Sequence, residues 1–155
     1  MKKIIFAAFA ACLALFTSCD KSGVDHTGDA TGKLYGTWVL DTKTVGNQTT
    51  DFSGDNFILY LFEPMLAFAQ EGTLLTFDID DVDAVTFSYN ANQNQISFHQ
   101  MLSLSKGFLV NQKTMTLYGT YDIPELTNEK LELTQVSNSV TTTYRYHKVS
   151  ASASK

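Results

Sequence analysis

Cysteine and positive charge are both scarce in this sequence. Its 155 residues include two cysteines, Cys12 and Cys19, and 11 basic side chains against 16 acidic ones. Proteins that bind nucleic acid need a basic footprint for the phosphate backbone. This chain offers only scattered lysines and a single arginine, Arg145. We therefore expect no nucleic-acid partner.

An apolar run long enough to span a membrane is also missing. The longest such run, Ile4–Phe16, has 13 residues, whereas a spanning helix needs about 17–25. Lys2 and Lys3 precede the run and Thr17-Ser18-Cys19 follow it, which is the order of a secretory leader. The sequence therefore predicts a signal peptide over residues 1–18.

The end of this leader, Leu15-Phe16-Thr17-Ser18-Cys19, resembles the bacterial lipobox. The resemblance implies that Cys19 is acylated and that the chain is cut just before it. Two or three acyl chains would hold the mature protein firmly to the bacterial outer membrane, its first expected partner. Whether it faces the periplasm or the cell surface stays open. Cys12 leaves with the leader, so no thiol remains for a disulfide, a zinc site or a nucleophile.

The mature chain divides into a tether, a domain and a tail. Residues 20–32 hold one large aliphatic side chain among polar and glycine residues, so we expect a lipidated flexible tether over 19–32. Residues 33–149 are enough for one domain with a sizeable core, and residues 150–155 are expected to be a disordered tail. Without the leader the net charge is −7, from nine basic and 16 acidic side chains.

From Tyr35 onward, apolar and polar side chains alternate as they do in half-buried antiparallel strands. Glu63–Gln70 is the exception, because Pro64 favours a short helix there, although an apolar loop fits as well. Closing the sheet would bury its apolar face and remove its edges. We therefore predict an all-β fold, an antiparallel up-and-down barrel of eight or nine strands. The expected strands are Tyr35–Val45, Phe57–Phe62, Thr73–Ile79, Ala84–Asn90, Gln95–His99, Leu102–Val110, Lys113–Ile123, Lys130–Ser137 and Val140–Val149.

The first expected strand opens with Gly36-Thr37-Trp38, which contains the only tryptophan. This triplet resembles the Gly-x-Trp signature of the lipocalin and fatty-acid-binding superfamily. Together with the lipobox and the C-terminal runs Gly119–Leu133 and Thr143–His147, it makes residues 33–149 resemble small bacterial lipocalin-like lipoproteins. The resemblance implies a barrel with one closed end.

That resemblance assigns structural roles to Gly36, Trp38 and Arg145. In the superfamily the tryptophan plugs the closed end, and a basic residue from the last strand packs across it, with Arg145 as the matching residue. Such a cation–π contact is worth about 0.5–2 kcal/mol. If Tyr144 and Tyr146 face inward, however, alternation points Arg145 outward. The contact then needs a bulge, a strand end or the opposite register.

Motifs for catalysis or metal binding are few. His26, His99 and His147 stand apart in the sequence, and no Gly-x-Ser-x-Gly elbow occurs. The acidic run Asp78–Asp83 resembles a cation site, but it lacks the glycine and the final glutamate of an EF-hand, so we prefer a solvated turn. We expect no catalytic activity, no cofactor and no metal.

Aromatic side chains indicate a binding function. Seven tyrosines and eight of the 11 phenylalanines lie beyond the leader, and an inward tyrosine hydroxyl needs a polar partner. An eight-stranded barrel is either filled by side chains or holds one small ligand. We therefore expect a small apolar or amphipathic ligand, with a filled barrel that acts as a structural module or binds an envelope protein as the alternative. The candidate ligand contacts are Phe77, Phe87, Tyr89, Phe98, Met115, Tyr121, Tyr144 and Tyr146.

Overall fold

The computed structural model describes residues 30–62, 65–71, 84–108 and 111–149 of the chain. Several expectations concern residues outside this part and are not addressed by it. They are the signal peptide, the acylated Cys19, most of the tether over 19–32, the strand Thr73–Ile79 with its Phe77, the acidic run Asp78–Asp83 and the tail over 150–155.

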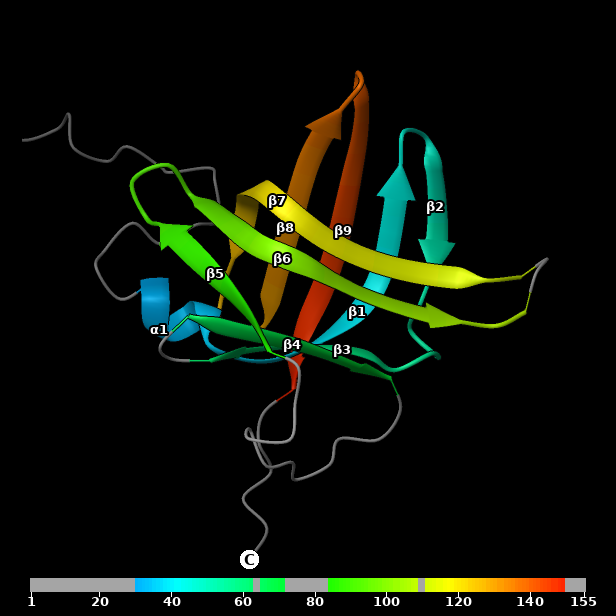
Figure 1. Cartoon of the computed structure of the whole chain (residues 1–155), viewed down its shortest axis with the longest axis horizontal. Helices are drawn as coiled ribbons and strands as arrows, with labels where there is room; N and C mark the ends of the chain where they lie inside the picture. Colours follow the sequence, from blue (N-terminus) through cyan, green and yellow to red (C-terminus); the bar gives the residue numbers. More distant parts are fainter. Residues whose placement is uncertain (1–29, 63–64, 72–83, 109–110, 150–155) are drawn as a thin grey trace, which may run out of the picture.

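The described part is a closed antiparallel β-barrel with one short helix (Figure 1). The strands pair in the order β2-β1-β3-β4-β5-β6-β7-β8-β9, and β1 also pairs with β9, which closes the sheet. Because β2 only extends the edge of β1, eight strands form the barrel, and the predicted all-β fold is confirmed. The elements are α1 (Ala30–Leu34), β1 (Gly36–Val45), β2 (Gln48–Asp51), β3 (Phe57–Phe62), β4 (Leu66–Glu71), β5 (Val85–Asn90), β6 (Gln95–Lys106), β7 (Lys113–Leu126), β8 (Lys130–Ser137) and β9 (Val140–Val149).

The expected helix or loop near residues 63–70 is wrong, because most of this segment belongs to strand β4. Six residues of β4 pair with β3, from Phe57↔Glu71 to Phe62↔Leu66. The buried Ala67 and Ala69 face the barrel interior opposite Leu61 and Leu59. Alanine favours helices, but burial against a neighbouring strand outweighs so weak a local preference.

The expected strand Gln95–His99 and the first five residues of the expected strand Leu102–Val110 both belong to the single strand β6, which ends at Lys106. The pairing of β6 with β7 shifts register between Phe98 and Leu102, and the three residues between them are all exposed. The sequence pattern therefore looks interrupted although the strand continues.

Strand β2 and helix α1 had no sequence signal. All four residues of β2 are exposed, so no apolar alternation marks it. Helix α1 begins at Ala30, within the segment expected to be a tether, and it carries the fully buried Leu34. The folded domain therefore starts at least three residues before the expected boundary at residue 33.

Strand β3 is apolar on both faces, so alternation alone does not separate its inward side chains. Leu59 and Leu61 join the barrel core. Ile58 and Tyr60 form a second buried cluster with Val39 on the outer side of β1 and β3. A continuous apolar run of this kind is typical of a strand that is covered on both faces.

The barrel has two unlike ends. At the end that we call the closed end, α1 meets the first strand through a hydrogen bond between Trp38 and Leu34. In the described part of the chain, the opposite end, which we call the open end, comprises the β1–β2, β6–β7 and β8–β9 hairpins and the loop over residues 52–56. In Figure 1 the β1–β2 and β8–β9 hairpins rise side by side, whereas the β6–β7 hairpin extends in another direction.

These hairpins diverge because β7 leaves β8 halfway along the barrel. The pairing of β7 with β8 runs from Leu126↔Leu131 to Asp122↔Thr134, and β7 then bends at Gly119, whose φ is +78°. An L-residue with a side chain rarely adopts this conformation, so glycine suits the bend. Main-chain groups of β7 beyond the bend need partners other than β8.

Candidate functional site

Trp38 plugs the closed end of the barrel. Its side chain is fully buried, and its Nε1 donates a hydrogen bond to the main-chain oxygen of Leu34, at 2.9 Å. Lys148 of β9 places its Nζ 4.8 Å from the centre of the indole ring and donates to the main-chain oxygen of Lys33, at 2.7 Å. Both bonds satisfy carbonyls at the end of α1, where no following helical turn supplies N–H donors. Helix, tryptophan and lysine therefore seal this end together.

Arg145 does not pack across Trp38, so this expected contact is wrong. Arg145 lies opposite Thr42 on β1 and is exposed, with its Nε 2.7 Å from Oε2 of Glu132. Lys148 lies opposite Trp38 instead. Alternation explains the difference, because Lys148 is two residues beyond the inward-facing Tyr146.

Gly36 leaves room for this lysine. Its φ is +138°, and a Cβ added there would lie 2.5 Å from Cε of Lys148. A side chain at this position would both strain the backbone and displace the lysine from the indole ring. The glycine and the tryptophan of the Gly-x-Trp triplet therefore serve one arrangement.

A connected series of aromatic rings fills the middle of the barrel. Ring centres lie 6.2 Å apart for Phe87 and Phe98, 5.9 Å for Phe98 and Tyr121, 6.2 Å for Tyr121 and Tyr144, and 6.5 Å for Tyr144 and Tyr146. These five side chains are each exposed by 3% or less, which leaves almost no room for water beside them. The series crosses the barrel between β5 and β9, so it forms part of a packed core.

The inward tyrosine hydroxyls are bonded to protein groups. Tyr144 donates to the main-chain oxygen of Thr116 at 2.8 Å, and the Tyr121 hydroxyl accepts from the main-chain N–H of Tyr118 at 3.2 Å. Tyr146 donates to Sδ of the buried Met115 at 3.3 Å. Two of the three bonds serve main-chain groups of β7 where this strand has left β8. These hydroxyls therefore stabilise the barrel wall and do not need a ligand.

Gln135 of β8 supports the same stretch of β7. Its Nε2 donates to the main-chain oxygens of Tyr118 and Thr120, at 3.0 and 3.1 Å. The side chain thus bridges the gap that opens between the two strands.

Burial also shifts the ionisation of these tyrosines. Burial, with a smaller contribution from the neighbouring Tyr121, raises the pKa of Tyr144 to about 12. The pKa values of Tyr121 and Tyr146 are raised too, again mainly because burial disfavours a phenolate.

Tyr89 is the exception among the described ligand candidates. Its ring is partly buried against the core, and its hydroxyl is buried without a hydrogen-bond partner among the described residues. Burial raises the pKa of this hydroxyl. Of the other candidates, Phe87, Phe98, Met115, Tyr121, Tyr144 and Tyr146 lie in the filled core.

Lys43 faces the barrel interior at the open end. It lies opposite Tyr144 on β9, and its Nζ is 5.5 Å from the centre of that ring. The same Nζ donates to the main-chain oxygen of Thr114 on β7, at 2.9 Å. No carboxylate of the described residues forms an ion pair with it, and burial lowers its pKa. Composition gave no sign of this desolvated ammonium. The signal that could have found it is the inward-facing Tyr144, because Lys43 lies directly opposite it in the β1–β9 pairing.

Two further lysines lie at the open end. Lys113 pairs with the carboxylate of Asp55, donates to the main-chain oxygen of Asp51 and lies 5.4 Å from the centre of the buried Phe52 ring. Lys106, directly opposite Lys113 on β6, donates to the main-chain oxygen of Asp55 at 3.4 Å. Lysines from the β6–β7 hairpin therefore hold the loop over residues 52–56 in place.

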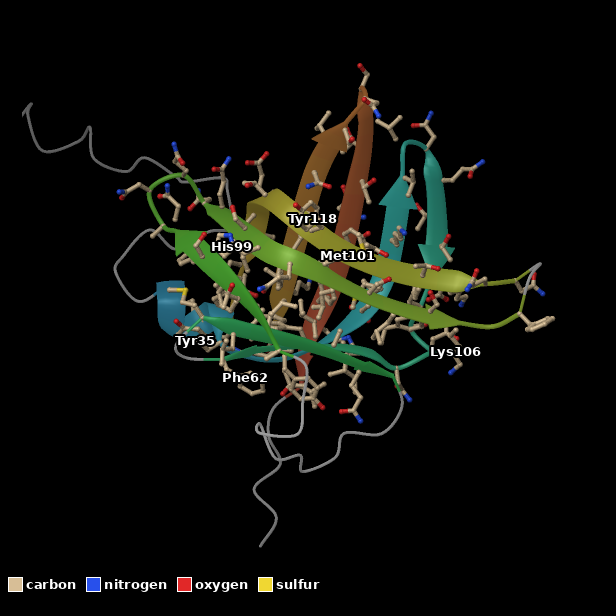
Figure 2. The ribbon with its side chains drawn as sticks, in the orientation of Figure 1. Tyr35, Phe62, His99, Met101, Lys106 and Tyr118 are labelled. Carbon is tan, nitrogen blue, oxygen red and sulfur yellow. The ribbon has the colours of Figure 1, made fainter. Side chains whose placement is uncertain are left out.

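The outer wall of the barrel carries few groups suited to catalysis. His147 pairs with Asp41, with 2.7 Å between Nδ1 and Oδ1, at an exposed position. His99 is exposed beside Met101 and Tyr118 on the outer side of β6 and β7 (Figure 2). Within the described ranges, no three histidine, aspartate or glutamate side chains gather as metal ligands do. The helix in this part of the chain is also too short to cross a membrane.

Comparisons with known proteins do not assign a family. No family model, no curated protein and no solved structure matches this chain. Its function must therefore be inferred from its own residues.

Proposed function

We propose that this chain is a membrane-anchored, lipocalin-like lipoprotein of the bacterial cell envelope that binds a small amphipathic molecule, without catalysis, at the open end of its barrel. The leader and Cys19 support the anchor. Gly36, Trp38 and a basic residue of the last strand support the lipocalin-like character, with Lys148 in the role first expected of Arg145.

One observation carries the location of the binding surface. The closed end is sealed by Trp38 and the middle is filled by aromatic rings, whereas the open end combines a desolvated ammonium with exposed apolar side chains. Val45 is 42% exposed and Val140 is 43% exposed. By alternation both share the inward face with Lys43. An amphipathic ligand could place its polar group against the ammonium of Lys43 and its apolar part against the two valines.

The position of the anchor supports the same surface. The tether expected after Cys19 joins the barrel at α1, which belongs to the closed end. As a flexible coil, this tether would span a root-mean-square distance of about 20 Å. The open end therefore lies on the opposite side of the barrel from the point where the tether would join it.

A second candidate function is an interaction module for another envelope protein. The filled core favours it, and so do exposed apolar side chains on the outer wall, with Met101 at 65%, Tyr118 at 56% and Val136 at 64% exposure. In this case the outer wall, and not the open end, would be the contact surface.

Mutation of one hairpin separates the two candidates. Val140 and Val136 lie on opposite faces of the β8–β9 hairpin, since Ser137, the residue next to Val136, is the one that pairs with Val140. We expect Val140→Ser to weaken the saturable binding of a neutral environment-sensitive fluorophore, N-phenyl-1-naphthylamine, to the mature chain carrying Cys19→Ser. Val136→Ser is the matched control and should leave binding unchanged. Equal loss in both variants, or no saturable binding, would exclude a ligand site at the open end.

The anchor is tested separately. We expect the wild-type chain to incorporate a palmitate analogue in growing cells and Cys19→Ala to lose the label. A labelled Cys19→Ala variant would show that the chain is anchored in another way or at another residue.

A further inference from the structure

The register shift between β6 and β7 brings four exposed side chains together on the outer wall of the barrel. At the shift, β6 has three residues where β7 has one, and bulges of this kind change the direction of side chains. Figure 2 shows three of the four on this side of the molecule. The four residues are His99, Gln100 and Met101 of β6 and Tyr118 of β7.

The main chain of Tyr118 is held on both sides. Its N–H donates to the hydroxyl of Tyr121, and its carbonyl oxygen accepts from Nε2 of Gln135. The exposed ring of Tyr118 therefore stands on a fixed support, and a ligand that packs on it would lose little affinity to ordering of the backbone.

Gln100 is oriented by a neighbouring strand. Its Oε1 accepts from the main-chain N–H of Thr86 on β5, at 2.9 Å, and lies 3.4 Å from the Thr86 hydroxyl. The amide oxygen therefore points toward β5, and Nε2 has no hydrogen-bond partner among the described residues. The exposed amide nitrogen can offer two N–H donors to a ligand.

Paired hydroxyls continue along both strands from the register shift. The pairs are Ser97 with Thr120 at 2.7 Å, Ser103 with Thr116 at 3.0 Å and Ser105 with Thr114 at 3.4 Å. Each pair uses one proton internally and keeps one O–H donor and several lone pairs for a ligand. We call these six residues, with the four at the register shift, the β6–β7 face.

None of the ten residues of the β6–β7 face carries a carboxylate, an ammonium or a guanidinium group. The outer side of β8 and β9 differs, because Arg145 and Glu132 form an ion pair there and Lys130 lies opposite His147. A charged partner would lose water from its own charges on the β6–β7 face without gaining an ion pair. The face is therefore complementary to an uncharged partner.

The apolar part of the β6–β7 face is small. Met101 and Tyr118 are its large apolar side chains, and Val136 lies on β8, which does not pair with this stretch of β7. The core of a protein interface needs a larger group of apolar and aromatic side chains. A sugar ring fits better, because its C–H groups can pack on one aromatic ring while its hydroxyls bond to amides and hydroxyls at the rim.

We infer that the β6–β7 face binds a neutral polysaccharide, with one sugar ring packed on Tyr118 and its hydroxyls bonded to Gln100. At about 3.3 Å per residue, the strand from Ser97 to Ser105 extends roughly 25 Å, so further sugar units would lie along the paired hydroxyls. This site is separate from the open end and does not rest on the function proposed above.

The test uses native gels that contain a polysaccharide, in which a protein that binds it migrates more slowly. The neutral polysaccharides are a β-glucan, dextran, a mannan, a galactan and a xylan, and polygalacturonate is the charged comparison. We expect at least one neutral polysaccharide to slow the mature chain carrying Cys19→Ser, and polygalacturonate to leave it unaffected.

Variants then locate the site. Tyr118→Ala should weaken this binding about tenfold or more, the usual effect of losing an aromatic anchor from a binding surface, whereas Tyr118→Phe should keep most of it. Val136→Ala, which shortens an exposed apolar side chain on the outer side of β8, is the matched control and should bind like the wild type. Equal weakening by Val136→Ala and Tyr118→Ala would contradict the assignment to this face.

A second measurement needs no variant of the face. In the chain labelled at its methionine methyl groups, a hexasaccharide of the polysaccharide that binds should shift the NMR signal of Met101 and leave that of the buried Met115 in place. If the Met101 signal does not move, the sugar binds elsewhere and the inference is wrong.

The other outcomes are also decisive. If none of the neutral polysaccharides slows the chain, or if polygalacturonate does so as strongly, the inference is wrong. If no polysaccharide binds but a photocrosslinking residue at position 118 captures one envelope protein in growing cells, the face serves the second candidate function instead. Binding of N-phenyl-1-naphthylamine should be equal in Tyr118→Ala and the wild type, so failure here leaves the open-end proposal intact.

Discussion

The two ends of the barrel use the same arrangement of a lysine, an aromatic ring and a main-chain carbonyl. At the closed end Lys148 lies 4.8 Å from the ring of Trp38 and donates to Lys33. At the open end Lys43 lies 5.5 Å from the ring of Tyr144 and donates to Thr114. Burial lowers the pKa of both lysines.

What differs is the covering around each arrangement. Helix α1 covers the closed end with the fully buried Leu34, and the lysine there completes a sealed plug. At the open end partly exposed valines flank the lysine. The comparison indicates that a desolvated lysine is a structural element where the surrounding chain encloses it, and a candidate binding group where the neighbouring surface stays accessible.

The largest effect is expected from removal of the plug. Trp38→Ala should lower the free energy of unfolding by about 3–5 kcal/mol, the usual range for truncation of a buried large aromatic side chain. Denaturant titration of the mature chain carrying Cys19→Ser measures this change. A loss below about 1 kcal/mol, the usual size of a surface effect, would mean that the closed end is not sealed by this residue.

Glycine substitutions compare the two ends directly. Gly36→Ala should lower stability by about 1–3 kcal/mol, because it forces an unfavourable φ and places a Cβ against Lys148. Gly46→Ala, in the β1–β2 turn, has φ +56° and nothing within 4 Å of the added Cβ, so only the backbone penalty of about 1–2 kcal/mol applies. The same titrations compare the variants. A greater loss for Gly46→Ala would contradict the tight packing assigned to the closed end.

Lys148 and Arg145 separate a structural cation from a surface one. Lys148→Met should lower stability by about 1–2 kcal/mol, because it removes the cation–π contact and a hydrogen bond to α1. Arg145→Met removes only an exposed ion pair with Glu132, which is worth about 1 kcal/mol or less. The two variants should also differ in the fluorescence of Trp38, which only Lys148 contacts. If Arg145→Met lowers stability more than Lys148→Met does, the result would support Arg145 as the cation that packs across Trp38.

A further small effect concerns Tyr144, whose ring lies against Lys43. Tyr144→Phe should lower stability at neutral pH by about 0.5–1.5 kcal/mol through loss of the bond to Thr116. In the wild type the pKa of Tyr144 is about 12, above its ordinary value of 10.0. The unfolded chain therefore releases this proton first, and stability falls as the pH rises from about 10 to about 12.

The phenylalanine variant lacks this proton, so its stability should fall less steeply over the same range. Urea titrations at several alkaline pH values measure the slope, with Tyr118→Phe as the control for an exposed hydroxyl. If Tyr144→Phe and the wild type have equal slopes, the Tyr144 hydroxyl is not desolvated and the middle of the barrel is more open than its packing indicates.

Prediction from sequence worked best where apolar and polar side chains alternate along a single strand. The alternation around Tyr144 and Tyr146 predicted their inward faces and already placed Arg145 outside. It failed over 63–70, because Pro64 and the two alanines after it, Ala67 and Ala69, have the local preference of a helix. It also missed β2, whose exposed polar residues are paired only because the hairpin brings them beside β1.

Composition and alternation determined the all-β class and most of the inward-facing side chains, because a two-residue period is a local property of the chain. Barrel closure determined which side chains from distant strands contact each other. The β1–β9 register, with its shift between Leu40 and Thr42, placed Lys148 against Trp38 and Lys43 against Tyr144. The divergence of β7 from β8 left main-chain groups of β7 without strand partners, and inward tyrosine hydroxyls form hydrogen bonds with them. Such contacts join residues as far apart in the sequence as Trp38 and Lys148, so no local pattern records them.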